Sequence, residues 1–120
     1  MRGALYWLAI VQAIYFLITG VWPIVHLRSF MAVTGPKVDY WLVKTVGAIV
    51  TVIGIVIGIA AMREGGRFEI ELVVLAAGSA AALGAVDVIY VAKRVIARIY
   101  LADALVEAIL VAAWVILWRA

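Results

Sequence analysis

The chain has 120 residues, of which 69% are hydrophobic and only 14% are charged, and its mean hydropathy is +1.23. So few charged side chains cannot cover a water-facing surface, which excludes an ordinary soluble domain. The sequence contains no cysteine, which excludes disulfides, thiolate metal sites and redox dithiols. The net charge of +3 comes from basic residues between apolar segments, where attraction to lipid headgroups explains it better than nucleic acid binding.

Four apolar segments of membrane length follow one another along the chain. A bilayer core needs about 20 apolar residues per helix, so we predict helices over about 4–27, 41–62, 72–92 and 99–118. The first segment is too long for the apolar region of a signal peptide, and we expect it to be a retained helix. The turn after residue 92 follows from length alone, because one helix over 72–118 would measure about 70 Å. The expected fold is all-α: a single domain, 1–120, forming an antiparallel up-down four-helix transmembrane bundle.

Polar and small residues recur at steps of three and four along each predicted helix, which indicates a face turned toward other helices. These faces comprise Gln12, Tyr15, Thr19, Trp22 and His26; Lys44, Gly47, Thr51, Gly54 and Gly58; and Ala77, Ala80, Gly84 and Asp87. Gly54 and Gly58 form a GxxxG pattern, which permits close approach of another helix. The partner is either a helix of the same chain or a second protomer, and a homodimer is the predicted assembly.

Three carboxylates lie within the last two predicted helices. Asp103 and Glu107 are four residues apart and so share one helix face, and a charge near the centre of a membrane costs between ~2.5 and ~17 kcal/mol. Asp87 and Asp103 are nearly equidistant from the third connection, so they are expected at one depth. His26 and Lys44 flank the first connection on the same membrane face. We therefore predict that these four residues share one layer, with Glu107 beneath them.

The candidate site is a ligand-binding site, and no catalytic residue, cofactor or metal is assigned. Aromatic residues are included because they can line an apolar pocket. Its predicted members are Gln12, Trp22, His26, Lys44, Asp87, Tyr100, Asp103 and Glu107. Several have simpler roles open to them: Lys44 can snorkel to headgroups, His26 can be an interfacial residue, and Asp87 can form a structural ion pair.

The balance of charge suggests what the site binds. Lys44 offsets one of the three carboxylates, and the surplus suits protons, a metal ion or a cationic ligand. The predicted function is transport or binding of a proton, a cation or a small polar or cationic ligand. A membrane enzyme that uses a carboxylic acid and a carboxylate on a lipophilic substrate is one alternative. A structural subunit of a membrane complex, whose charges only pair helices, is another.

The stretch from Ser29 to Lys37, with Asp39, Trp41 to Lys44, and Gly47, resembles small uncharacterised bacterial integral membrane proteins with four helices. It covers about one fifth of the chain. The layout of four helices is also similar to that of DoxX-like proteins, although no motif specific to them is present. Small multidrug transporters differ, because their essential Glu lies in the first helix. The resemblance implies a four-helix fold in a bacterial membrane and no particular activity.

Basic residues in the connections predict the orientation. One face carries four of them and the other carries five: Arg2, Arg63, Arg67 and Arg119 against Arg28, Lys37, Lys93, Arg94 and Arg98. The positive-inside rule then places both termini outside the cytoplasm. The expected location is the inner membrane of a bacterium or archaeon, crossed several times.

Overall fold

A computed structural model describes residues 2–64 and 67–119, and their regular structure is entirely helical. Four of the helices are long and apolar enough to cross a membrane, judged by length and composition. The prediction of an all-α four-helix bundle is therefore confirmed, and the four candidate spans indicate a multi-pass integral membrane protein. The helices are α1 (Arg2–Val25), α2 (Leu27–Thr34), α3 (Tyr40–Glu64), α4 (Ile70–Ala92) and α5 (Tyr100–Arg119).

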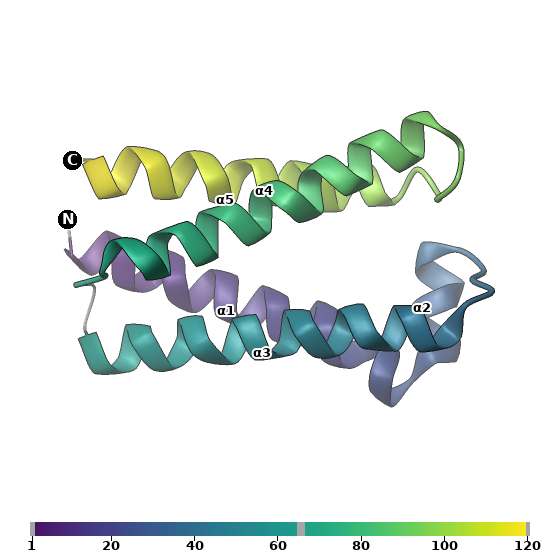
Figure 1. Ribbon diagram of the computed structural model, residues 1–120, viewed down its shortest axis with the longest axis horizontal. Coiled ribbons are helices and arrows are strands. Elements are labelled where there is room, and N and C mark those ends of the chain that lie inside the picture. Colours follow the sequence, from purple (N-terminus) through teal and green to yellow (C-terminus); the bar gives the residue numbers. More distant parts are fainter. Residues whose placement is uncertain (1, 65–66, 120) are drawn as a thin grey trace.

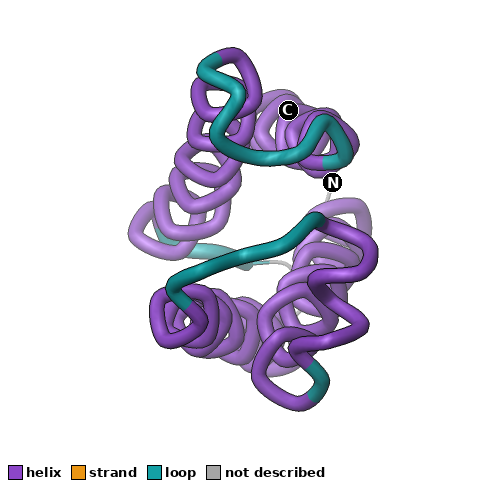
Figure 2. Tube along the Cα trace, turned by 90° about the vertical axis from the view of Figure 1, so that its right-hand side faces the viewer, coloured by secondary structure: helices purple, strands orange, loops and turns teal. Residues whose placement is uncertain are grey.

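The bundle consists of two helix pairs. α1 packs along α3 and α4 packs along α5, whereas contacts between the two pairs are far fewer. Figure 1 shows the four long helices running back and forth along one axis, with α1 beginning and α5 ending at the same end. Figure 2 shows the two pairs end on. Large apolar side chains point outward, including Trp7 (64% exposed), Ile49 (56%) and Ile109 (59%), as suits helices surrounded by lipid.

Glycines set the close packing of α1 against α3. A Cβ atom built at Gly20 would lie 2.7 Å from the carbonyl oxygen of Gly47, too near for any real side chain. A Cβ atom at Gly54 would lie 3.2 Å from the carbonyl oxygen of Ala13, so the GxxxG pattern also packs against α1. Of the two partners considered for these glycines, the one present is a helix of the same chain. The pattern therefore no longer supports a homodimer.

The first connection contains a helix that sequence analysis did not predict. The first span was expected to continue to residue 27, but α1 ends at Val25 and His26 adopts a non-helical conformation (φ −144°, ψ 78°). The His26 side chain accepts a hydrogen bond from the backbone N–H of Ser29 at 3.2 Å, which caps the start of α2. The capping bond explains why the chain changes direction here, three residues after Pro23.

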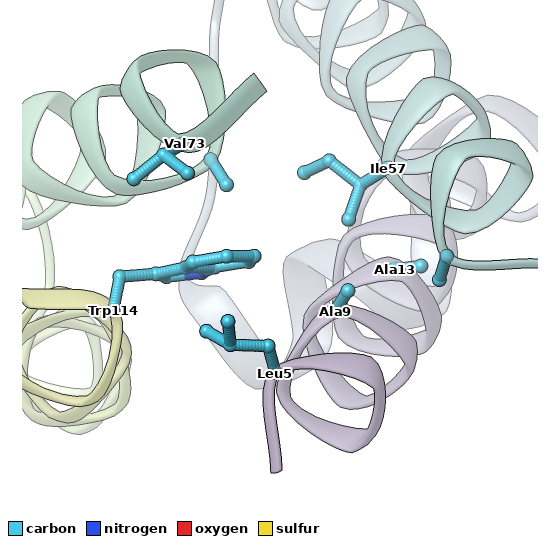
Figure 3. Close-up of a cluster of buried hydrophobic side chains, with 8 residues drawn as sticks. Leu5, Ala9, Ala13, Ile57, Val73 and Trp114 are labelled. Atoms are coloured by element: carbon cyan, nitrogen blue, oxygen red, sulfur yellow. The ribbon is translucent and has the colours of Figure 1, made fainter. Parts of the chain in front are cut away.

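A buried cluster joins the two pairs at the end where the termini lie. Trp114 of α5 has no exposed surface and packs with Leu5, Ala9, Ile57 and Val73 from the other three long helices (Figure 3). This core is the main contact that holds the two pairs together at their terminal end.

Candidate functional site

A large cleft lies between the two helix pairs, beyond the core around Trp114. Its volume is about 810 Å³, and its lining residues come from all five helices. Most of the wall is aliphatic, with Ile18, Val46, Val50, Leu83 and Val86 among the lining residues. A volume of this size and a mainly apolar wall are typical of sites for small organic ligands.

Three carboxyl groups and a phenol form the floor of the cleft. Glu107 is 2% exposed and Asp87 is 6% exposed, and both line the cleft together with Asp103. The Tyr15 hydroxyl donates a hydrogen bond to Oδ1 of Asp103, which joins α1 to α5. Three carboxyl groups gathered in one largely buried site cannot all ionise readily, because each negative charge opposes the others.

Two atoms of this acidic floor lack a partner. Oδ2 of Asp87 and Oε1 of Glu107 are buried, and neither accepts a hydrogen bond from any described residue. Leaving a buried polar atom unpaired costs about 1–3 kcal/mol, and more if the group is charged. No lysine or arginine among the described residues therefore neutralises these two carboxyl groups by direct contact. Their unpaired atoms identify the floor as a place where a cation would gain favourable contacts.

The local sequence explains how the acids reach this position. Asp103 and Glu107 are one helical turn apart on α5 and face the cleft together. Asp87 faces them from α4, because the α4–α5 turn falls where it was predicted, after Ala92. Gly84 lets the helices come close at this level: a Cβ atom there would lie 3.2 Å from Cβ of Glu107.

Aromatic rings surround the other end of the cleft, near α2, which we call the mouth. Trp22 and Phe30 pack edge to face with ring centroids 5.4 Å apart, and Tyr100 approaches from α5. The indole N–H of Trp22 donates to Oγ of Ser29 at 2.8 Å, which fixes α2 against the end of α1. The cleft therefore has an aromatic mouth, an aliphatic wall and an acidic floor.

The structure brings together five of the eight predicted site residues. Those that line the cleft are Trp22, Asp87, Tyr100, Asp103 and Glu107. Gln12, His26 and Lys44 do not line the cleft.

The expected layer of His26, Lys44, Asp87 and Asp103 does not form. His26 is exposed and caps α2, and Lys44 is exposed on the outside of α3. Lys44 was assigned to the face of α3 that carries Gly47, but Gly47, Val43 and Val46 line the cleft whereas Lys44 does not. The prediction that Lys44 offsets one carboxylate is therefore corrected, because the floor lacks this cation.

Gln12 lies outside the cleft, in the core at the terminal end. Its Oε1 accepts a hydrogen bond from the indole N–H of Trp114 at 2.6 Å, and its Nε2 donates to the carbonyl oxygen of Ala76 at 2.8 Å. These bonds tie α1 to α5 and α4. Gln12 is fully buried with both ends of its amide bonded, so its place in the predicted ligand site is corrected to a structural one.

The predicted site did not include Phe30 and Lys37 of the first connection, the aliphatic residues of the cleft wall, or the hydrogen bond made by Tyr15. The first connection was predicted to be a turn between two helices, and none of its residues was assigned to the site. Tyr15 was assigned to the polar face of the first predicted helix, but nothing in the sequence pairs it with Asp103, 88 positions away.

No group of three or more His, Asp or Glu side chains within residues 2–64 and 67–119 is arranged to hold a metal ion. No family model, curated protein or solved structure matches the chain. The resemblance to small bacterial four-helix proteins stays a prediction. The site must therefore be interpreted from its own chemistry.

Proposed function

We propose that the chain binds an organic cation with an apolar body in the cleft between its helix pairs, as a transporter or binding protein of the membrane. The observation that carries this proposal is the pair of unpartnered carboxyl atoms, on Asp87 and Glu107, at the floor of a mainly apolar cleft. The positive charge of the ligand is attracted to the carboxyl oxygens at the floor, and an apolar body fills the aliphatic space above it.

The wall of the cleft favours an organic cation over a bare metal ion. Metal ions such as Ca²⁺ take six or more oxygen ligands, whereas most of this lining is carbon. Aromatic rings such as those of Trp22 and Tyr100 attract cations through their faces and can also stack on an apolar ligand. Buried carboxyl groups that are protonated in the empty cleft release protons when they bind a cation, which links ligand binding to proton release.

The two alternative functions have less support. A structural subunit would be expected to pair its buried charges, yet Asp87 and Glu107 each retain an unpaired atom. A membrane enzyme would use the same acids on a lipophilic substrate, and the hydrogen bond from Tyr15 to Asp103 does not favour that chemistry over binding. The proposal concerns a single chain, because the glycines of α3 are engaged within it.

A pair of matched ions tests the proposal. Tetraphenylphosphonium and tetraphenylborate have nearly the same size and shape but opposite charge. We expect the purified protein in lipid nanodiscs to bind the cation and to reject the anion, with binding that strengthens as the pH rises because protons are released. Calorimetry against empty nanodiscs measures both. Equal binding of the two ions, or binding of neither, would contradict an organic-cation site.

The proposed location is the inner membrane of a bacterium or archaeon, with the termini outside the cytoplasm. The mouth of the cleft then faces the cytoplasm, since α2 and the α4–α5 turn lie at the opposite end from the termini (Figure 1). Single cysteines at Val38 and Arg67, both exposed, are expected to react with a membrane-impermeant maleimide from opposite sides of the membrane. In intact cells only Arg67→Cys should be labelled, and labelling of Val38→Cys alone would reverse the orientation.

A further inference from the structure

The ammonium group of Lys37 is held at the mouth of the cleft by a set of oxygens and rings. Its Nζ donates hydrogen bonds to the carbonyl oxygens of Thr34 (3.1 Å) and Gly35 (3.0 Å) and to the Thr34 hydroxyl (3.2 Å). The same atom lies 5.8 Å from the ring centroid of Phe30 and 5.0 Å from that of Tyr100. Both distances are within the range of cation–π attraction. These five groups together make a complete environment for a cation.

This arrangement spans the mouth. Phe30 and Thr34 belong to α2 on one side, whereas Tyr100 begins α5 on the other. The backbone of the α2–α3 connection also approaches the α4–α5 turn: a Cβ atom at Gly35 would lie 3.4 Å from Cβ of Ala97. Gly35 has a φ of 98°, which residues with a side chain rarely adopt, so a glycine is needed at this contact. Lys37 therefore links the two sides of the mouth through its contact with Tyr100.

Lys37 also differs in charge from the other residues that line the cleft. It is the one cationic side chain that lines the cleft within the described part of the chain, and the acidic floor lies deeper in the same cleft. Its ammonium is bonded to neutral oxygens and rings at the mouth and makes no hydrogen bond to a carboxylate among the described residues. An arriving cation meets this group before it reaches the acids.

We propose that Phe30, Tyr100 and the carbonyl groups of Thr34 and Gly35 form an outer cation site, which Lys37 occupies in this structure and which an organic cation takes by displacing it. This inference rests on the proposed function, because it places a second site on the path to the acidic floor. Displacement of Lys37 breaks the link to Tyr100 and loosens the mouth. Lys37 is thus a tethered competitor that keeps the mouth closed until a ligand replaces it.

Replacing Lys37 with Met tests the competition. Methionine retains an apolar chain of similar length but has no charge, so the outer site becomes free. We expect Lys37→Met to bind tetraphenylphosphonium about three- to tenfold more tightly than the native protein, because the ligand no longer has to displace a competing cation. Lys44→Met is the matched control, since Lys44 is exposed and lies outside the cleft, and it should bind as the native protein does. Weaker or unchanged binding in Lys37→Met would overturn the proposal and leave Lys37 as a structural clamp.

A second measurement does not depend on ligand binding. Spin labels at Val38 and Arg98 sit on the two connections that meet at the mouth, and pulsed electron paramagnetic resonance reports the distances between them. Without added ligand, Lys37→Met is expected to give a broader and longer distance distribution than the native protein, and Lys44→Met an unchanged one. Identical distributions in Lys37→Met and native protein would overturn the tether. If tetraphenylphosphonium binds to neither protein, the proposed function fails, while the distance measurement still decides whether Lys37 closes the mouth.

Discussion

Glu107→Gln is expected to weaken the binding of tetraphenylphosphonium by about 10- to 100-fold while leaving the fold intact. The amide has nearly the shape of a protonated carboxylic acid, so the contact with Gly84 and the packing of α4 on α5 are preserved. The lost interaction is that between a buried anion and the ligand's positive charge. At an effective dielectric constant of about 20, two opposite unit charges about 6–8 Å apart attract each other by about 2–3 kcal/mol, and each 1.4 kcal/mol corresponds to a factor of ten in affinity.

Proton release separates this role of Glu107 from a purely structural one. Calorimetric titrations in buffers of different ionisation enthalpy give the number of protons released on binding. We expect fewer protons from Glu107→Gln than from the native protein. Glu71→Gln provides the matched control, since Glu71 is exposed in the first turn of α4 and outside the cleft. Equal release from Glu107→Gln and native protein would show that Glu107 is not the titrating group, and a structural role would then be the better interpretation.

The helices and the acidic floor could be predicted because both follow from local rules. Apolar length defines a membrane span, and the four long helices lie close to the segments predicted from it. Asp103 and Glu107 are one turn apart on one helix, and Asp87 faces them across a short turn. Antiparallel geometry alone therefore brings these three carboxyl groups to one region.

The position of Lys44 could not be predicted because a helix in this bundle faces both a tightly packed neighbouring helix and the cleft. Gly54 of α3 packs on α1, Val46 lines the cleft, and Gly47 does both. A three–four pattern identifies residues that face other helices without distinguishing packing from a cavity. Lys44 continues the three–four pattern of these glycines toward the start of α3, where its side chain is exposed.

The mouth and the terminal core depend on contacts that no local pattern encodes. The bond between Trp114 and Gln12 joins residues 102 positions apart, and the Lys37 environment combines a short helix with the start of α5. The segment Leu27–Thr34 is only 8 residues long, far shorter than a membrane span, and it lacks any buried residue. Its capping by His26, the hydrogen bond from Trp22 to Ser29 and the packing of Trp22 on Phe30 place it at the cleft.

Gly20→Ala is expected to destabilise the protein by about 3 kcal/mol, the upper end of the usual cost of overpacking. The new Cβ atom would lie 2.5 Å from Oγ1 of Thr51 and 2.7–2.8 Å from backbone atoms of α3, so the two helices must move apart along their main contact. Gly78→Ala is the control, because a Cβ atom there meets nothing within 4 Å. In an exposed helical position this change is expected to stabilise the protein by about 0.5–1 kcal/mol.

Reversible unfolding in mixed detergent micelles, followed by circular dichroism, measures both changes. The effect of Gly20→Ala should extend to the cleft, because α1 and α3 form one of its two walls and Gly47, which meets Gly20, also lines it. Separating these helices displaces Thr19 and Val50 relative to the acidic floor, so tetraphenylphosphonium should bind more weakly to Gly20→Ala and equally well to Gly78→Ala. If Gly20→Ala has the same free energy of unfolding as the native protein, α1 and α3 do not approach each other this closely. The shape of the cleft between the helix pairs would then also differ from the one described.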